Sequence, residues 1–355
     1  MLTKLRASLA SANVEALLVL DETNRQYLTG VHTTAGAVLI TPNAALFITD
    51  FRYIEMARAC VKHMIVEMNT RENPFTKLVG EALAAEGLTR VGFLSKQMTV
   101  SELEGWRKLD TLELVPTPDV VTDLRICKTA DEVEKTRKAQ QIAERALTES
   151  WKLVRPGMTE KELAAEIVYR MHLYGADKPS FDPIVVAGPN SALPHGVPGD
   201  RPFQRGDFIT TDIGVQYQGY CSDMTRTAAL GEATEEMRAI YAKVLEAQLA
   251  SLAAVQPGKT GAEVDAVARD IIAAAGYGNC FGHGLGHGTG LDIHEAPTLS
   301  PTGPVPLRPG MMVTVEPGIY LPGQFGVRIE DMGVVTENGF ENLMTLPKEL
   351  KILPC

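Results

Sequence analysis

Hydrophobic and polar positions alternate in short blocks along the first third of the chain. Four apolar runs have the length and aliphatic content of β-strands: 16–20, 37–40, 45–48 and 91–94. Three other segments have helical composition: 52–60, 75–86 and 101–109. Leu2, Leu5 and Leu9 are spaced to share one face of a first helix. Residues 1–125 are therefore predicted to form a small α/β domain.

A second domain is predicted to follow. The boundary is expected within residues 123–131, just before a charged helical segment at 132–153. A chain of 355 residues is long enough for two domains of about 150 residues each. Residues 126–355 are therefore expected to form the second, larger domain.

This second part contains an internal repeat. The segments RPGMTEKELAAEI and QPGKTGAEVDAVARDI carry Pro, Gly, Thr and Glu at matching positions, 101 residues apart. In each copy a Thr followed three residues later by a Glu predicts a capping box at the start of a helix. The match continues into RGDFITTD and RPGMMVTVE, which carry an acid at the same distance from a glycine. The pattern predicts two related α+β units with carboxylates at equivalent strand positions.

The segment FITTDIGVQYQGYCSDMTRTA is predicted to form the first of two hairpins, with Gly219 close to the bend. A bend between Tyr217 and Gln218 would place Asp212 directly opposite Asp223. Opposed side chains on one face of a strand pair have Cβ atoms about 4.5–5.5 Å apart. Two buried carboxylates at that distance repel each other unless a cation neutralises them, and a pair of divalent metals suits the gap.

The segment VTVEPGIYLPGQFGVRIEDMGVV predicts the second hairpin. A bend centred on Gly323 would place Glu316 opposite Glu330. Any one strand acid is most simply explained as a solvated edge residue or a salt-bridge partner. Four acids in two matched pairs on apolar strands are better explained by a metal site, because burying an uncompensated acid is costly.

Histidine placement strengthens this interpretation. Three of the seven histidines, His283, His287 and His294, lie within the segment HGLGHGTGLDIH. Glycines beside the first two allow close approach of the backbone. Hard oxygen ligands with one imidazole suit Mn²⁺, Co²⁺ or Zn²⁺. The residues therefore predict a carboxylate-rich dinuclear site that activates water.

Charge and composition exclude several other classes of protein. The net charge of −10 disfavours nucleic-acid binding, and no apolar window is long enough to span a membrane. Asn13 and Glu15 interrupt the apolar stretch that a secretion signal would need. Five widely spaced cysteines without a CxxC pair predict neither a disulfide framework nor a thiolate zinc site. A cytoplasmic protein is expected.

These motifs together resemble the pita-bread metallopeptidases, and within them the Xaa-Pro branch of prolidase and aminopeptidase P. The resemblance rests on FDPIVVAGPNSALPHG, TTDIGVQYQGYCSDMTRT, GHGLGHGTGLDIHEAP, VTVEPGIY and GVRIED. It implies an α+β pita-bread catalytic domain with an internal pseudo-twofold repeat at 126–355. A smaller α/β creatinase-like N-terminal domain is implied at 1–125.

The resemblance also implies a metal site. It places the family's five ligands at Asp212, Asp223, His287, Glu316 and Glu330, holding two divalent ions, with Mn²⁺ expected and Co²⁺ or Zn²⁺ as alternatives. Asp223 and Glu330 would bridge both ions. A hydroxide held between the ions would attack the scissile carbonyl, and Glu316 would pass its proton towards the leaving nitrogen.

Four further residues receive roles from the resemblance. His294 is expected to stabilise the tetrahedral intermediate, and His195 and His283 to hold the proline side of the substrate. Arg328 is expected to orient the metal carboxylates or to bind the substrate. The resemblance further implies a homodimer.

Two activities share every motif. Prolidase hydrolyses the Xaa-Pro bond of dipeptides, whereas aminopeptidase P acts on longer peptides. The difference would depend on a cation that captures the dipeptide carboxylate. Arg25, Arg52 and Arg71 are candidates, although each is more simply a surface charge. Resemblance to compact bacterial forms favours prolidase.

Two other interpretations are weaker. A non-catalytic peptide-binding scaffold of the same fold would be expected to have lost ligands, and all five are present. Methionine aminopeptidases share the ligands but lack the large N-terminal domain and do not usually carry a histidine at position 283.

Overall fold

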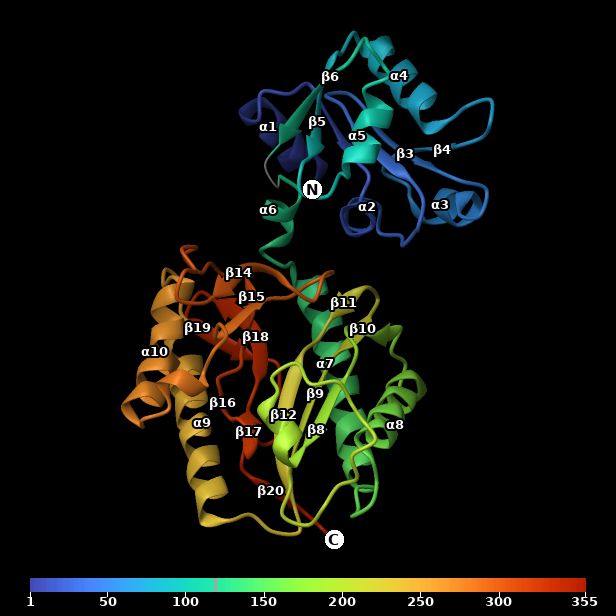
Figure 1. The fold of residues 1–355 in the computed structure, drawn as a ribbon. Helices are drawn as coiled ribbons and strands as arrows, with labels where there is room; N and C mark the ends of the chain where they lie inside the picture. The colour runs from blue at the N-terminus through green and yellow to red at the C-terminus, as the bar shows by residue number, and fades with distance from the viewer. Residues whose placement is uncertain (118–119) are drawn as a thin grey trace. The chain divides into compact units, whose positions relative to one another are not determined.

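The computed structural model describes residues 1–117 and 120–355, which divide into two compact units, Met1–Arg125 and Ile126–Cys355. The first unit contains a mixed sheet in the order β4-β3-β2-β1-β5-β6 (Figure 1). Its strands are β1 (Ala16–Val19), β2 (Ala37–Ile40), β3 (Ala45–Thr49), β4 (Ile65–Met68), β5 (Arg90–Leu94) and β6 (Glu113–Thr117). Its helices are α1 (Leu2–Ser11), α2 (Glu22–Thr29), α3 (Ile54–Cys60), α4 (Phe75–Glu86), α5 (Val100–Trp106) and α6 (Thr122–Arg125).

Strand β1 lies inside this sheet and is buried on both faces. Leu17 packs in one apolar cluster with Leu5 and Leu9 of α1. Leu18 packs in another cluster with Leu83 of α4. Successive side chains of a strand point to opposite faces, so a short unbroken apolar run supplies both clusters.

The predicted strands and helices of the first unit are confirmed, with no end more than three residues from its predicted position. Helices α2 and α6 and strands β4 and β6 have no counterpart among the elements predicted from the sequence. Strand β4 has the sequence IVEM and lies at the sheet edge, where its side chains are exposed or half-buried. A four-residue edge strand gives a weak sequence signal, because burial does not impose a regular pattern on it.

The second unit places strands between two pairs of helices (Figure 1). The helices are α7 (Ala130–Trp151), α8 (Glu160–Leu173), α9 (Glu235–Ala254) and α10 (Gly261–Ala274), with short 3-10 helices η1 (Gly188–Ala192) and η2 (Gly278–Cys280). One sheet has the order β20-β12-β9-β8, and another has the order β14-β13-β15-β18-β19. Smaller sheets contain β11-β10-β7 and β16-β17.

The strands of the first of these sheets are β8 (Ile184–Ala187), β9 (Phe208–Ile213), β12 (Met224–Leu230) and β20 (Lys351–Leu353). The strands of the second are β13 (Gly286–Gly288), β14 (Glu295–Leu299), β15 (Met312–Val315), β18 (Asp331–Thr336) and β19 (Gly339–Asn342). The remaining strands are β7 (Lys178–Pro179), β10 (Val215–Tyr217), β11 (Tyr220–Cys221), β16 (Gly318–Leu321) and β17 (Phe325–Arg328). One apolar cluster joins α7 and α8 to the first sheet, and another joins α9 and α10 to the second.

The internal repeat is confirmed in the helices. Both α8 and α10 have 14 residues, and both begin with the predicted Thr–Glu capping box. Each is followed by a glycine with positive φ, Gly175 at 99° and Gly276 at 90°. A glycine adopts this left-handed conformation without steric cost, so both helices end at equivalent positions.

The predicted register of the first hairpin is wrong by two residues. Asp212 lies opposite Thr225 and not opposite Asp223. The bend falls on Gln218 and Gly219, which have positive φ of 48° and 84°. Positive φ at both central residues is the mark of a tight type I′ turn, which shifts the bend one residue further along the chain.

The predicted register of the second hairpin is confirmed by the pairs on either side of the acids. Gly318 pairs with Arg328, and Val315 pairs with Asp331. Gly323 lies in the turn with a φ of 76°. The charged helix predicted at 132–153 begins earlier, at Ala130, because Thr129 caps it.

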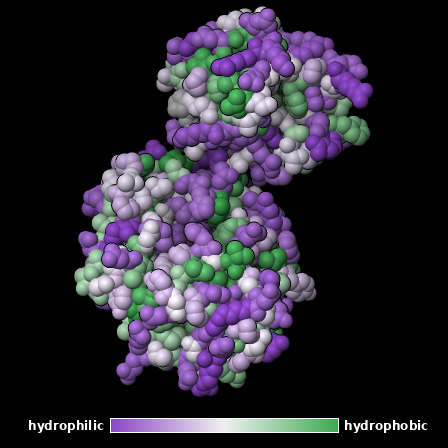
Figure 2. All heavy atoms as spheres, in the orientation of Figure 1, coloured by the Kyte–Doolittle hydropathy of each residue, from purple (hydrophilic) through white to green (hydrophobic). Residues whose placement is uncertain are grey.

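No helix in the described parts of the chain has the length and apolar content needed to cross a membrane. Hydrophilic residues cover most of the visible surface of each unit, with hydrophobic residues in small groups between them (Figure 2).

Candidate metal centre

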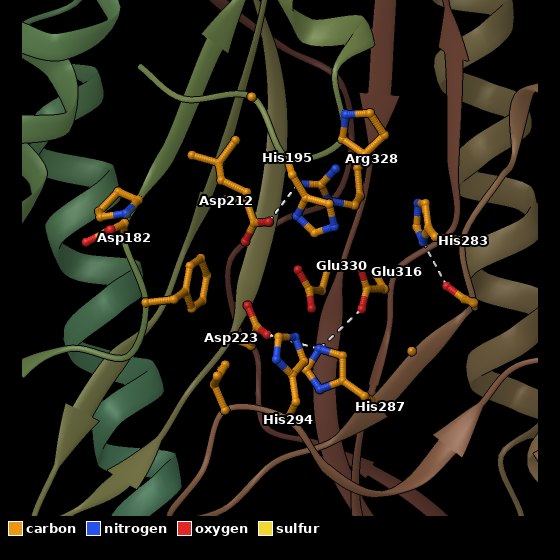
Figure 3. Close-up of a pocket in the computed structure, with 18 of the residues that line it drawn as sticks. Asp182, His195, Asp212, Asp223, His283, His287, His294, Glu316, Arg328 and Glu330 are labelled. Carbon is orange, nitrogen blue, oxygen red and sulfur yellow. Dashed lines mark hydrogen bonds and ion pairs between the residues drawn. The ribbon is translucent and has the colours of Figure 1, made fainter. Parts of the chain in front are cut away.

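A cavity of about 470 Å³ lies inside the second unit (Figure 3). Its lining includes every residue assigned to the site from the sequence: His195, Asp212, Asp223, His283, His287, His294, Glu316, Arg328 and Glu330. Apolar side chains such as Phe181 and Ile184 complete the wall. Residues far apart along the chain therefore converge on one cavity.

Strand ends supply most of these side chains. Asp212 lies on β9. Asp223 lies immediately before β12, Glu316 immediately after β15 and Glu330 immediately before β18. His287 is the central residue of the short strand β13. At a strand end the side chain is not confined to the alternation of the sheet, and it can turn into the cavity.

Glycines on both sides of His287 allow β13 to fit between its neighbours. A Cβ atom added at Gly286 would lie 2.1 Å from the carbonyl oxygen of Thr314, and one added at Gly288 would lie 2.3 Å from that of Ala296. No real Cβ contact is so short, so the predicted need for glycine beside His287 is confirmed.

The potential ligand atoms form a tight group. One ligand atom from each of Asp223, His287 and Glu330 lies within 4.8 Å of the others. The Nε2 atom of His287 is 3.4 Å from Oε1 of Glu316 and 3.5 Å from Oδ2 of Asp223. This spacing is suitable for a cation between the side chains.

Two carboxylates each have one oxygen bonded and one oxygen without a partner. Arg328 Nη2 donates to Asp212 Oδ2 at 2.6 Å, and Thr225 Oγ1 donates to Glu330 Oε2 at 2.7 Å. Asp212 Oδ1 and Glu330 Oε1 are buried without a hydrogen-bond partner among the described residues. Buried polar atoms are rarely left unpaired, so these two oxygens fit a divalent cation.

The imidazole of His287 is in the form that a metal requires. Its Nδ1 atom lies 3.0 Å from the carbonyl oxygen of Gly288, which can only accept a hydrogen bond. The proton is therefore on Nδ1, and Nε2 has a free lone pair. Burial lowers the pKa of His287 to about 4, which keeps the ring neutral at pH 7.

The pKa values of the carboxyl groups shift in the opposite direction, upward. Burial, and then the neighbouring acids, raise the pKa of Asp223 and the pKa of Glu330 well above their usual range. Burial also raises the pKa of Glu316 to about 8. Several acids close together in a desolvated cavity favour the protonated form of their carboxyl groups. Bound cations would supply the positive charge that keeps these groups ionised.

A chain of hydrogen bonds runs from His283 to Asp212. The His283 Nδ1 atom lies 2.8 Å from the carbonyl oxygen of Gly284, so its Nε2 accepts from the Tyr320 hydroxyl at 2.9 Å. Tyr320 in turn accepts from Arg328 Nη1 at 2.8 Å, and Arg328 donates to Asp212 as described above. Burial lowers the pKa of His283 to about 4. Both of its ring nitrogens are therefore used within the protein.

The other two histidines are exposed within the cavity. The His294 ring lies 4.3 Å from the His287 ring between centroids, at an interplanar angle of 66°. His195 lies in the loop after η1. Figure 3 shows the His195 and His294 rings beside the group of carboxylates.

Tyr320 and Thr225 are parts of the site that were not predicted from the sequence. Both belong to motifs that carry the family resemblance, VTVEPGIY and TTDIGVQYQGYCSDMTRT, but spacing alone gave neither a role. Their hydroxyl groups hold Arg328 and Glu330 through hydrogen bonds, and these contacts are visible only in the folded structure.

The three arginines considered for carboxylate capture lie in the first unit. Arg25 is buried, and its Nη2 donates to the Thr33 carbonyl at 2.6 Å, so it is not the surface charge that was expected. Arg52 is an exposed partner of Asp50, at 2.7 Å. Arg71 is exposed. Arg25 therefore stabilises the first unit by binding its backbone.

Comparison with known proteins identifies both parts of the chain. Residues 134–337 match the model of metallopeptidase family M24, and residues 1–127 match the creatinase/prolidase N-terminal domain. A Xaa-Pro dipeptidase of Pyrococcus furiosus is 38% identical, with 98% of this chain and 99% of the relative covered.

Two solved structures are similar throughout. A Xaa-Pro dipeptidase from Bacillus anthracis has a TM-score of 0.96 at 42% identity, covering 99% of each chain. An X-Pro aminopeptidase from Thermotoga maritima has a TM-score of 0.92 at 36% identity, covering 98% of this chain and 99% of the other. The predicted pita-bread fold with a creatinase-like N-terminal domain is confirmed. The chain belongs to metallopeptidase family M24.

Proposed function

We propose that this metallopeptidase is a Xaa-Pro dipeptidase, which hydrolyses the bond between the first residue and proline. The observation that carries the proposal is one cavity that combines five potential metal ligands with three further histidines. The similarity to dipeptidases over nearly the whole of each chain supports the same substrate class. An Xaa-Pro bond is a tertiary amide without an N–H, so a dedicated pocket is reasonable.

We propose that Asp212, Asp223, His287, Glu316 and Glu330 would hold two divalent cations. Hard oxygen donors with one imidazole favour Mn²⁺, and they also accept Co²⁺ or Zn²⁺. When bound, the cations supply an activated water and polarise the scissile carbonyl.

The protein side chains would perform the proton transfer and the positioning. Glu316 lies beside His287 and would carry a proton at its carboxylate towards the leaving nitrogen. His294 is exposed within the cavity and would donate a hydrogen bond to the oxygen on which negative charge develops. Arg328 would orient Asp212, to which it donates at 2.6 Å.

The two remaining histidines would line the proline side of the substrate in different ways. His195 is exposed in its loop and would donate or accept a hydrogen bond. Both ring nitrogens of His283 have partners within the protein, so its ring carbons would form part of an apolar wall.

Activity on longer peptides is the second candidate function, because an X-Pro aminopeptidase has the same fold over almost its full length. The two activities are separated by comparing the kcat/KM of Ala-Pro with that of Ala-Pro-Ala in the Mn²⁺-loaded protein. A dipeptidase is expected to prefer Ala-Pro strongly. Comparable turnover of the tripeptide would overturn the dipeptidase assignment in favour of the aminopeptidase.

We further propose a cytoplasmic homodimer. The widely spaced cysteines support a reducing compartment, and the family resemblance supports the dimer. Light scattering on a size-exclusion column would test the dimer, and a mass near 38.5 kDa would contradict it.

A further inference from the structure

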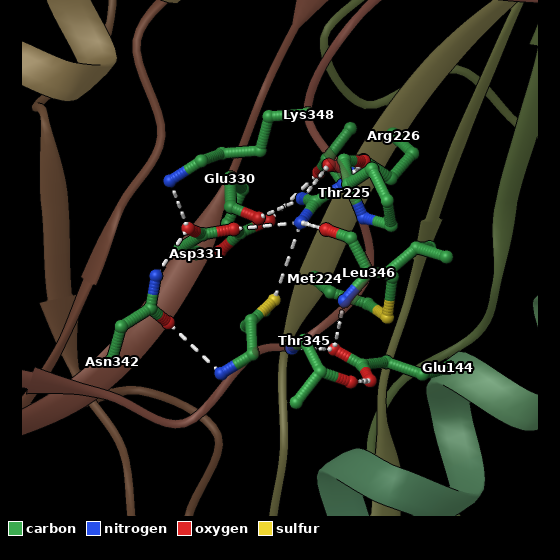
Figure 4. A network of polar contacts seen from close by, with 12 residues as sticks. Glu144, Met224, Thr225, Arg226, Glu330, Asp331, Asn342, Thr345, Leu346 and Lys348 are labelled. Atoms are coloured by element: carbon green, nitrogen blue, oxygen red, sulfur yellow. Dashed lines mark hydrogen bonds and ion pairs between the residues drawn. The ribbon is translucent and has the colours of Figure 1, made fainter.

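A buried arginine, Arg226, contacts the main chain of Glu330 (Figure 4). Arg226 is on β12, and its side chain is 2% exposed. It is absent from the lining of the cavity, whereas the neighbouring Thr225 hydroxyl contacts Glu330 and Arg328. Successive residues of a strand face opposite ways, so Thr225 faces the site and Arg226 faces the layer behind it.

All three guanidinium nitrogens of Arg226 are hydrogen-bonded. Its Nη1 donates to the Glu330 carbonyl at 2.6 Å and to the Thr225 carbonyl at 3.0 Å. Its Nη2 donates to Asp331 Oδ1 and to the Leu346 carbonyl, both at 2.8 Å. Its Nε donates to the Pro347 carbonyl at 3.2 Å. One side chain thus connects three separate stretches of backbone.

The contacts of Glu330 connect the hydrogen bonds of Arg226 to the candidate metal site. The Glu330 N–H donates to the Thr225 carbonyl at 3.1 Å, its carbonyl accepts from Arg226, and its Oε2 accepts from the Thr225 hydroxyl. Among the described residues, Oε1 is the one polar atom of Glu330 that has no partner. Residues 225 and 226 therefore fix Glu330 at three points and leave one oxygen available.

The same two residues follow Asp223 on the chain. Asp223 belongs to the first copy of the internal repeat and Glu330 to the second, and none of the strand pairs in the described part of the chain joins β12 to β18. The contacts of Thr225 and Arg226 join the two copies at this point.

Asp331 and its other partners hold the guanidinium in place. Asp331 is 1% exposed, and its Oδ2 accepts from Asn342 Nδ2 at 2.6 Å and from Lys348 Nζ at 2.7 Å. A buried ion pair contributes little net stability, because desolvation offsets the attraction between the charges. Its most useful contribution is a fixed position, here that of the guanidinium relative to Glu330.

We propose that Arg226 is a positioning residue for metal binding, which fixes the main chain of Glu330 relative to Asp223, with Asp331 and Lys348 holding its guanidinium. The proposal rests on the metal ligands assigned under the proposed function. Partners of metal ligands typically change metal affinity by about 10–100-fold when they are removed. An effect of that kind is expected here, without loss of any ligand.

The test compares metal affinity in Arg226→Lys with that of the wild type. Mn²⁺ is titrated calorimetrically into metal-free protein, well below the unfolding temperature. Lysine keeps the charge but not the planar fork, so the weakest Mn²⁺ site is expected to lose about tenfold or more in affinity. Activity should return at saturating Mn²⁺. Unchanged affinity in the folded variant would overturn the proposal.

Two further variants make the test decisive. Lys348→Met removes one contact from Asp331 at a side chain that is 19% exposed, so it is expected to fold and to weaken Mn²⁺ binding about threefold, a fraction of the usual effect of such partners. If Arg226→Lys does not fold, unchanged affinity in Lys348→Met overturns the proposal instead. Asp207→Asn is the matched control, because it removes the charge and one of the two oxygens that accept from Arg201, outside the cavity lining. It should lower stability and leave Mn²⁺ affinity unchanged.

The wild type separates this inference from the proposed function. Failure of the wild type to bind Mn²⁺ would refute the assigned metal site itself. Tight Mn²⁺ binding by the wild type together with equally tight binding by Arg226→Lys would refute only the role of Arg226.

Discussion

The loop that carries His195 is anchored by a buried acid at the start of α8, and this anchor predicts a specific loss of function. The Glu160 side chain is fully buried. Its Oε1 accepts from the Ala187 N–H at 2.8 Å and from Asn190 Nδ2 at 3.1 Å, and its Oε2 accepts from the Gly199 N–H at 2.9 Å. These bonds hold both ends of the segment around His195.

The substitution Glu160→Gln keeps the size of the side chain but replaces one acceptor with an NH₂ group. The amide oxygen can keep the bonds to Ala187 and Asn190, and the NH₂ group then faces the N–H of Gly199. An unpaired buried donor costs about 1–3 kcal/mol, and the two remaining bonds lose the strength that the charge gave them. The free energy of unfolding should fall by about 2–4 kcal/mol.

Thermal unfolding and the hydrolysis of Ala-Pro measure the two consequences. Tm should fall by several degrees. The kcat/KM for Ala-Pro should fall about tenfold, because small displacements of positioning groups are costly to catalysis. The control is Glu162→Gln in the same helical turn, an exposed capping residue whose loss should cost about 1 kcal/mol or less and leave kcat/KM unchanged. Equal effects of the two substitutions, or a wild-type kcat/KM in Glu160→Gln, would refute the anchoring role.

Three other outcomes are expected. Asp223→Ala removes one of the proposed metal ligands and should abolish Ala-Pro hydrolysis; substantial residual activity would mean that the site is misassigned. His283→Ala should lower the turnover of proline peptides while calorimetry still detects bound Mn²⁺, since its nitrogens bond to Gly284 and Tyr320 and not to the ligand group; loss of the metal would contradict a role in the pocket. Removing the metal with a chelator should lower Tm, because the repelling carboxylates lose their counter-charge, and Mn²⁺ at about 100 times its Kd should restore about 2.7 kcal/mol. A Tm that does not respond to Mn²⁺ would argue against metal binding by the folded protein.

The two hairpins show where sequence reasoning succeeded and where it failed. The turn at Gly323 gave the correct register for the strands that carry Glu316 and Glu330. The turn at Gln218 and Gly219 was placed one residue too early, so Asp212 was paired with the wrong partner. A tight turn that uses a non-glycine residue with positive φ has a weak sequence signal.

Some residues of the candidate site were predicted from the sequence, and others were found only in the structure. The acids and histidines were recognisable because their chemistry is unusual on apolar strands and in a glycine-rich segment. Thr225, Arg226 and Glu160 were not recognisable, because each is an ordinary residue type at its position. Their roles depend on contacts with residues that lie 27–121 positions away along the chain.

The sequence by itself determined the alternation of strands and helices, the two capped helices of the repeat and the residue types available for a metal site. These properties depend on local periodicity, capping and turn chemistry, which act over a few residues. The tertiary structure alone decided which oxygens are bonded and which are left free, and how Glu330 is held relative to Asp223. Those depend on packing between distant segments, where a shift of one residue in register changes every contact.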